Sequence, residues 1–152
     1  MTTYYLDSSA VVKRYVAEVG SNWVRDICQD VRNAIFISEL ALAEVSSAFA
    51  RRYRNGEITN ANRQNYLDLF IHDCAQSYQM MPAARPSIDR AVDLTQQHYL
   101  RGYDAVQLAC ALAANDSLVT LGLPPLIFVS ADDDLIAAAG VQHLRTENPN
   151  LH

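Results

Sequence analysis

The stretch MTTYYLDSSAVVKRY, residues 1–15, decides the fold, because a short strand-forming run leads through a carboxylate into a helix-forming segment. Tyr4 to Leu6 is rich in residues that favour strands, and Ser8 to Ala17 has the apolar spacing of a short helix. Asp7 therefore lies where a strand leaves the core, and it can cap the following helix. Its placement raises the question of whether other acids in the chain lie at similar positions.

Short strands and helices alternate along the rest of the chain. Further strands are expected at residues 34–37, 78–83, 126–130 and 141–146. Helices are expected at residues 21–30, 39–54, from 60 onward, 86–100, 103–116 and 135–140. Ser38 is the expected N-cap of the helix over residues 39–54. This alternation predicts one α/β domain over residues 1–152, with a parallel sheet covered on both faces. Ligands of such sheets bind beyond the carboxyl ends of the strands.

The composition is that of a globular protein, with 50% hydrophobic and 19% charged residues. Cys28, Cys74 and Cys110 are widely spaced in helix-like patterns, which favours buried thiols of a reducing compartment over disulfides or a metal site. The N-terminal segment lacks a signal-peptide pattern, and glycine and prolines interrupt the apolar segment 118–129. We therefore expect a cytoplasmic protein that does not span a membrane.

The formal net charge of −5 argues against a surface that coats nucleic acids, because such binding depends mainly on neutralising phosphates. A local basic patch is compatible with this charge. Arg51, Arg52 and Arg54 cluster at one helix end, and guanidinium groups bind phosphate well. A solvated helix terminus, where the helix dipole favours cations, explains the cluster equally well.

Two acids inside helices need an explanation. Glu44 lies within the apolar stripe of its helix and is expected to face the core side. A buried carboxylate is normally protonated, paired or bound to a metal, because its desolvation is costly. Asp104 opens the helix over residues 103–116, where the helix dipole gives it an ordinary role. Glu39 has the same ordinary explanation, and no function is assigned to it.

A run of three acids, Asp132, Asp133 and Asp134, follows the strand over residues 126–130, although one acid is enough to cap the next helix. The first and fourth strands of a doubly wound sheet are commonly neighbours, so Asp7 and Asp132 are expected to come together. Converging carboxylates repel, and a divalent cation relieves that repulsion. Oxygen ligands favour Mg²⁺ or Mn²⁺ over zinc, and the histidines show no ligand-like spacing.

In this order, the acidic motifs resemble those of PIN-domain ribonucleases, most closely the VapC-like toxins of bacterial and archaeal toxin–antitoxin pairs. YLDSSAVVKRYVAEVGS is similar to the opening of that family, and ISELALAEVSSAFARR to its second motif. RGYDAVQLACALA resembles the third motif, and FVSADDDLIAAA the fourth, in which the acid stands two residues after a serine or threonine. The acids that match the four motifs are Asp7, Glu44, Asp104 and Asp132.

The resemblance implies a PIN-like three-layer α/β/α domain with a central parallel β-sheet. It also implies a Mg²⁺- or Mn²⁺-dependent endoribonuclease that cleaves RNA, is inhibited by a cognate antitoxin protein and frequently forms a homodimer. The family's metal and catalytic site would consist of the four motif acids.

Roles within this site follow from the same resemblance. Asp7 and Asp104 are expected to bind the metal directly, whereas Glu44 binds through water or accepts a proton. Ser9 or Ser130 is expected to position phosphate or ligand oxygens by hydrogen bonding. The fourth acid stays open, since Asp134 can replace or assist Asp132.

Three other classes of protein are alternatives to a PIN-domain ribonuclease. A Mg²⁺-dependent phosphatase with an aspartyl nucleophile usually has a second acid two residues after the first, where this chain has Ser9. A receiver-like signalling domain would need paired acids after the first strand. A catalytically inactive PIN-like module that binds only proteins is the remaining alternative, and the presence of all four acids disfavours it.

Overall fold

A parallel sheet of five strands forms the centre of the molecule, with the strand order β3-β2-β1-β4-β5. The computed structural model describes residues 1–152. The strands are β1 (Thr3–Leu6), β2 (Ala34–Ser38), β3 (Gln79–Met81), β4 (Ile127–Val129) and β5 (Arg145–Glu147). Neighbouring strands are all parallel, as the alternation of strands and helices predicts.

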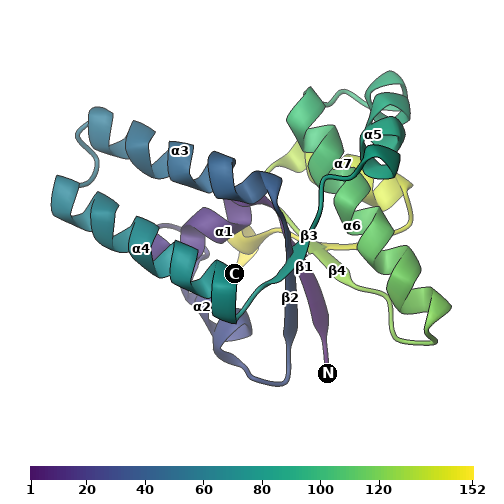
Figure 1. Cartoon of the computed structure of the whole chain (residues 1–152), viewed down its shortest axis with the longest axis horizontal. Coiled ribbons are helices and arrows are strands. Elements are labelled where there is room, and N and C mark those ends of the chain that lie inside the picture. Colours follow the sequence, from purple (N-terminus) through teal and green to yellow (C-terminus); the bar gives the residue numbers. More distant parts are fainter.

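Helices cover both faces of this sheet (Figure 1). One face carries α1 (Ser8–Tyr15), α2 (Ser21–Gln29), α3 (Leu40–Arg54) and α4 (Asn60–Gln76). The other carries α5 (Arg85–Gln97), α6 (Gly102–Thr120) and α7 (Asp133–Val141), and a short 3₁₀ helix, η1 (Pro149–Leu151), ends the chain. The three-layer α/β/α arrangement with a central parallel sheet confirms the fold class predicted from the sequence.

The sheet separates two apolar clusters of similar size, with 18 and 17 buried residues, so both faces of its central strands are covered. Successive residues of β1 enter different clusters: Leu6 packs with α1 to α4, and Tyr5 packs with α5 to α7. Strands buried on both faces are apolar at every position, which explains the continuous apolar runs in the sequence.

The register of the sheet places the ends of β1 and β4 side by side. Leu6 pairs with Val129, and the backbone N–H of Asp7 donates to the Val129 carbonyl at 3.0 Å. Asp7 thus extends the ladder one residue beyond β1, at the carboxyl edge of the sheet. The predicted neighbourhood of the first and fourth strands is correct.

Several predicted element boundaries are wrong. α6 runs from Gly102 to Thr120, so it begins one residue before and ends four residues after the predicted helix over residues 103–116. The last strand lies at residues 145–147 instead of 141–146, since α7 continues to Val141 and His143 turns the chain with a φ of 65°. The first helix ends at Tyr15, two residues before the predicted end.

The N-terminus of α3 differs from the prediction by one residue. The helix begins at Leu40, so Glu39 occupies the N-cap position and makes no side-chain capping bond. Ser38 belongs to β2, and its hydroxyl accepts a hydrogen bond from the Leu40 backbone N–H at 3.1 Å. Ser38 therefore still satisfies a free N–H group of the helix from one position earlier.

The three cysteines are free thiols. Cys110 is buried as predicted, whereas Cys28 and Cys74 are only partly buried, because α2 and α4 lie at the outside of their layer. None of the helices combines the length and the apolar composition that a membrane span requires.

Candidate active site

A cleft of about 1040 Å³ opens at the carboxyl edge of the sheet, between α3 and α6. Figure 1 shows that α3 and α6 both begin toward the end of the sheet where β1 stops. The cleft is lined by all four acids predicted from the sequence motifs: Asp7, Glu44, Asp104 and Asp132. They come from the end of β1, from α3, from α6 and from the loop between β4 and α7, so the fold gathers four distant segments.

Asp7 is the most deeply placed of these acids, with a relative exposure of 4%. Its Oδ1 accepts hydrogen bonds from the Ser9 hydroxyl at 2.6 Å and from the Ala10 backbone N–H at 2.9 Å. Its Oδ2 accepts a bond from the Ser130 hydroxyl at 2.7 Å. Burial nevertheless raises the pKa of Asp7 to about 6, because desolvation outweighs the three hydrogen bonds. Asp7 caps α1 and faces the cleft at the same time.

Ser9 and Ser130 connect Asp7 by hydrogen bonds to the β4–α7 loop, which carries Asp132. Ser130 Oγ accepts a hydrogen bond from the Asp132 backbone N–H at 3.0 Å, and Ser9 Oγ accepts one from the Ala131 N–H at 3.0 Å. Each serine therefore receives a backbone proton from the β4–α7 loop and donates its own proton to Asp7. Asp7 and Asp132 reach the same edge as predicted, and they are linked through Ser130.

Glu44 belongs to a hydrogen-bonded group that spans three elements. Its Oε1 accepts bonds from the Ser8 hydroxyl at 2.9 Å and from Gln107 Nε2 at 2.7 Å. Gln107 Nε2 also approaches Ser8 Oγ at 2.9 Å, and the buried Tyr5 hydroxyl donates to Gln107 Oε1 at 2.9 Å. The prediction that Glu44 faces the core is wrong in part: it is only half-buried, because the cleft opens beside this turn of α3.

Sequence reasoning missed Gln107, which is 1% exposed and lines the cleft. Its position offered a signal, since it is a polar residue inside the apolar stripe of α6, one helical turn after Asp104. A buried amide normally has several hydrogen-bond partners, and Gln107 finds them in Tyr5, Ser8 and Glu44.

Asp104 couples the acids electrostatically. Its side chain is half-buried in the first turn of α6, and its carboxylate accepts no hydrogen bond from the protein. Burial raises the pKa of Asp104 to about 6, repulsion from Asp132 and Glu44 adds to the effect, and Arg101 opposes it. The charge of Asp104 also contributes to the raised pKa of Asp7. The acids are therefore close enough to influence one another.

The three acids from Asp132 to Asp134 make different contacts. Asp132 Oδ1 caps α7 by accepting hydrogen bonds from the backbone N–H groups of Asp134 at 2.9 Å and Leu135 at 3.1 Å. Asp133 Oδ1 accepts a bond from the Asn148 amide at 3.1 Å, and Asp133 does not line the cleft. Both Asp132 and Asp134 do, so the choice between them stays open.

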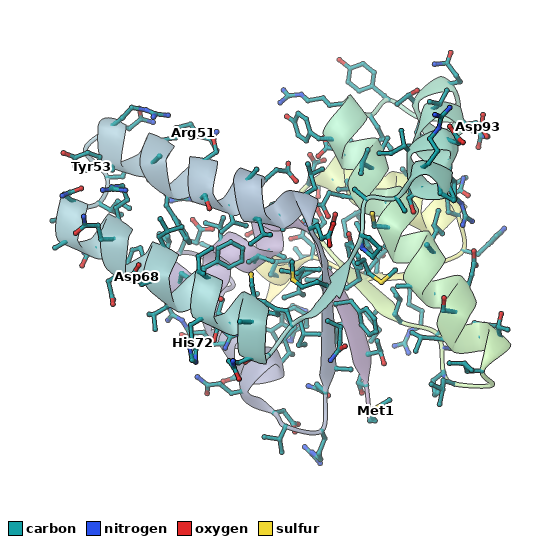
Figure 2. All side chains as sticks on the ribbon, viewed as in Figure 1. Met1, Arg51, Tyr53, Asp68, His72 and Asp93 are labelled. Atoms are coloured by element: carbon teal, nitrogen blue, oxygen red, sulfur yellow. The ribbon has the colours of Figure 1, made fainter.

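The arginine cluster on α3 also divides. Arg51 lines the cleft without an ion pair, and Figure 2 shows it on the side of α3 that faces away from α4. Arg52 Nη2 binds Glu18 at 2.6 Å and its Nη1 lies 3.5 Å from Glu57, while Lys13 binds Glu18 at 3.1 Å, so two carboxylates compensate these two cations. Arg54 lies outside the cleft. Of the three arginines, only Arg51 presents an uncompensated charge to the cleft.

A second unpaired cation, Arg101, lines the cleft from the segment that precedes α6. Its side chain is fully exposed, and its Nη1 donates to the Tyr103 hydroxyl at 2.8 Å. This hydrogen bond, with the nearby acids, raises the pKa of Arg101. Arg101 stands in the quoted third motif, but the interpretation of that motif considered only its acid. None of the four histidines lines the cleft.

The donors of the cleft fit a hard divalent cation in their chemistry. No group of three His, Cys, Asp or Glu side chains is arranged closely enough to form a complete metal site. The lining contains carboxylates and no His or Cys, and Asp104 and Asp132 Oδ2 make no hydrogen bond within the protein. Mg²⁺ keeps several waters and needs only one or two carboxylates, so an incomplete set of protein ligands is compatible with it.

A family model for the PIN domain matches residues 4–140 of the chain. The chain belongs to the PIN domain family. The match extends from β1 to α7 and includes all four cleft acids, so the family predicted from the motifs is confirmed.

Two curated relatives of this PIN domain are ribonucleases VapC45 and VapC49 of Mycobacterium tuberculosis, from strains CDC 1551 / Oshkosh and ATCC 25618 / H37Rv. Each is 32% identical over 123 residues, which cover 76% of this chain and 79% of the relative.

Two solved structures share its fold. VapBC2 from Rickettsia felis, bound to a DNA fragment from its promoter, matches with a TM-score of 0.64, 16% identity and coverage of 97% and 98% of the two chains. PAE2754 from Pyrobaculum aerophilum matches with a TM-score of 0.64, 18% identity and coverage of 99% and 93%. At these identities the comparison supports the arrangement of the sheet and helices alone.

Proposed function

We propose that this PIN domain is a Mg²⁺- or Mn²⁺-dependent endoribonuclease that acts as the toxin of a toxin–antitoxin pair. One observation carries the proposal: Asp7, Glu44, Asp104 and Asp132 line a single cleft, on a fold whose curated relatives are named ribonucleases. The cleft accommodates the scissile phosphate of an RNA strand between α3 and α6.

Asp7, Asp104 and Asp132 would hold the divalent cation, with Glu44 in contact through water. When bound, the cation supplies an activated water and neutralises charge on the phosphate oxygens. The protein contributes rigid placement of its acids. Asp7 is fixed by Ser9 and Ser130, so its carboxylate does not need to be ordered when substrate arrives.

Glu44 is suited to receive a proton from the attacking water. Ser8 and Gln107 bind Oε1 and so fix the orientation of the whole carboxylate, whereas Oε2 has no hydrogen-bond partner in the protein. A carboxylate in this position can act as a general base. Phosphate hydrolysis of this type needs no covalent nucleophile from the chain.

The substrate phosphates would contact the two unpaired cations of the cleft. Arg51 lies on the α3 wall and Arg101 lies before α6, so they can contact phosphates on either side of the acids. Local cations of this kind compensate for the acidic net charge of the whole chain. Binding that depends on only two cations should show a shallow dependence on salt concentration.

The proposal includes a cognate antitoxin, a homodimeric toxin and action in the cytoplasm. Support for the antitoxin comes from solved structures of the same fold, among them a toxin–antitoxin complex from Klebsiella pneumoniae. The product of a small reading frame beside the gene should co-purify with this protein and inhibit its RNA cleavage. Sedimentation equilibrium of the isolated protein measures its oligomeric state.

Cleavage of RNA with and without EDTA tests the catalytic proposal. Cleavage should require Mg²⁺ or Mn²⁺, and Asp7→Asn and Asp104→Asn should each lose more than the roughly 10–100-fold typical for an outer-shell partner of a metal. Asp133→Asn is the matched control, because Asp133 belongs to the acidic run but lies outside the cleft. Cleavage that survives EDTA, or that persists in both variants, contradicts the proposed site. A wild type that binds its antitoxin and cleaves nothing would be a binding module.

A further inference from the structure

The segment between α5 and α6 forms one lip of the cleft. Tyr99, Leu100, Arg101 and Tyr103 all line it, although only Asp104 in the next turn belongs to the acidic site. Leu100 is half-buried and packs against the apolar cluster under α5 and α6, which anchors the segment. The chain turns at Tyr99, where the Leu100 backbone N–H donates to the His98 carbonyl at 2.9 Å, and the side chains of Tyr99 and Arg101 are exposed on either side of Leu100.

Tyr99 is the least covered aromatic side chain of the protein, with an exposure of 93%. Its hydroxyl makes no hydrogen bond, and no aromatic ring or arginine packs on it. Tyr53 and Tyr103 are both 44% exposed, but each has a partner. The guanidinium of Arg63 lies 5.5 Å from the centre of the Tyr53 ring, and Arg101 binds the Tyr103 hydroxyl.

The two walls of the cleft differ in chemistry. The α3 wall carries small or aliphatic side chains together with Glu44, Arg51 and Arg52, and it has no aromatic residue. The lip before α6 carries two tyrosines and a planar guanidinium. Aromatic rings beside a phosphate-binding cleft are the groups on which unstacked nucleic-acid bases pack, and guanidinium planes stack in the same way. An RNA strand would therefore turn its bases toward the lip and its backbone toward the acids.

We propose that Tyr99 and Tyr103 stack on the bases that flank the scissile phosphate, and that Arg101 orients the Tyr103 ring through its hydroxyl and contacts a neighbouring phosphate. This inference rests on the proposed ribonuclease function and assigns its base-binding residues. Because both bases must leave the stack to reach the rings, the lip selects RNA with unpaired nucleotides on both sides of the cut.

An RNA oligonucleotide that is cleaved at one mapped site tests this assignment. Tyr99→Ala should raise KM about 5–150-fold, which corresponds to about 1–3 kcal/mol for one stacked base, and the loss should appear in KM rather than kcat. Tyr99→Phe keeps the ring and should restore the low KM. Tyr53→Ala is the matched control, because Figure 2 places Tyr53 at the far end of the α3–α4 pair, outside the cleft.

An abasic substrate separates stacking from a general structural effect. When the flanking base is removed and the backbone is kept, wild type and Tyr99→Ala should have the same KM. A difference that persists on the abasic substrate, or a wild-type KM for Tyr99→Ala on the intact substrate, overturns the assignment.

Direct binding distinguishes this inference from the proposed activity. The probe is the same oligonucleotide with 2-aminopurine beside the cleavage site. If no cleavage is found, an unstructured oligonucleotide that contains 2-aminopurine replaces it. The protein is the Asp104→Asn variant, which should bind the probe without cleaving it. Stacking on a tyrosine should quench the fluorescence of 2-aminopurine. The double variant with Tyr99→Ala and Asp104→Asn should lose this quenching and bind the probe more weakly. If wild type cleaves no RNA but this pattern is observed, the lip assignment stands and the ribonuclease proposal fails. If wild type cleaves RNA but Tyr99→Ala does not change the quenching, the lip assignment fails and the ribonuclease proposal stands.

Discussion

Asp7 is the residue at which burial and hydrogen bonding oppose each other most directly. Three hydrogen bonds favour its charged form, and desolvation still raises its pKa from 3.8 to about 6. A carboxyl group with a higher pKa in the folded protein than in the unfolded chain binds more protons when folded. Its ionisation therefore lowers the free energy of unfolding.

The pH dependence of stability reveals this cost. In the absence of metal, the ionisation of Asp7 should lower the free energy of unfolding as the pH rises from about 4 to about 6. The rise of its pKa from 3.8 to about 6 corresponds to a loss of about 3 kcal/mol. Asp7→Asn cannot ionise, so its stability relative to wild type should increase over the same range and stay constant above it. Urea denaturation of both proteins in EDTA measures the difference. A difference independent of pH would show that Asp7 does not titrate in this window.

Gln107 carries the second prediction at the residue scale. Gln107→Leu leaves the buried Tyr5 hydroxyl without the acceptor that it has in the wild type, which should cost about 1–3 kcal/mol of unfolding free energy. Removing that hydroxyl as well, in the double variant with Tyr5→Phe, should recover part of the loss. Thermal or urea denaturation of the single and double variants gives the coupling energy. Strictly additive effects would contradict the hydrogen bond between the two side chains.

At the scale of elements, α7 shows how one acid can have two roles. Asp132 caps the helix with Oδ1, so its removal affects both the helix and the cleft. Asp132→Ala should cost about 1 kcal/mol of stability, whereas Asp132→Asn should keep most of the cap and still lose RNA cleavage. Denaturation and cleavage assays on both variants separate the two roles. If Asp134→Asn abolishes cleavage and Asp132→Asn does not, the fourth acid is Asp134.

The existence of each element could be predicted, whereas several boundaries could not. Periodicity within a few residues is sufficient to recognise α6 or β4, since it reflects which face will be buried. α7 ends at Val141, and the turn that follows includes His143 at a φ of 65°, which the apolar spacing of this segment does not mark.

The whole molecule determines the electrostatics of the cleft. The chain has a net charge of −5, and the fold places four acids from separate segments on one cleft. The raised pKa values of Asp7 and Asp104, both about 6, reflect burial and mutual repulsion. A bound divalent cation should relieve this repulsion and thereby stabilise the folded state relative to the unfolded chain.

Thermal unfolding with Mn²⁺ tests this expectation. A ligand present at about 100 times its Kd adds about 2.7 kcal/mol, and about 1 kcal/mol shifts Tm by roughly 2–4 °C for a domain of this size. Millimolar Mn²⁺ should therefore raise Tm by several degrees, and Glu44→Gln should reduce that increase. KCl at matched ionic strength controls for screening of the acids. A wild-type Tm that ignores Mn²⁺ contradicts a metal site in the cleft.

Sequence alone was sufficient to determine the alternation of strands and helices and the parallel α/β fold, and to predict that Asp7, Glu44, Asp104 and Asp132 gather at one site, because burial patterns are local and the acids interrupt them. Only the tertiary structure placed Gln107 beneath Glu44, compensated Arg52 with Glu18 and brought Tyr99 to the rim of the cleft. The physical reason is that hydrogen bonds, ion pairs and exposure depend on contacts between residues far apart in the chain. Local sequence patterns do not encode those contacts.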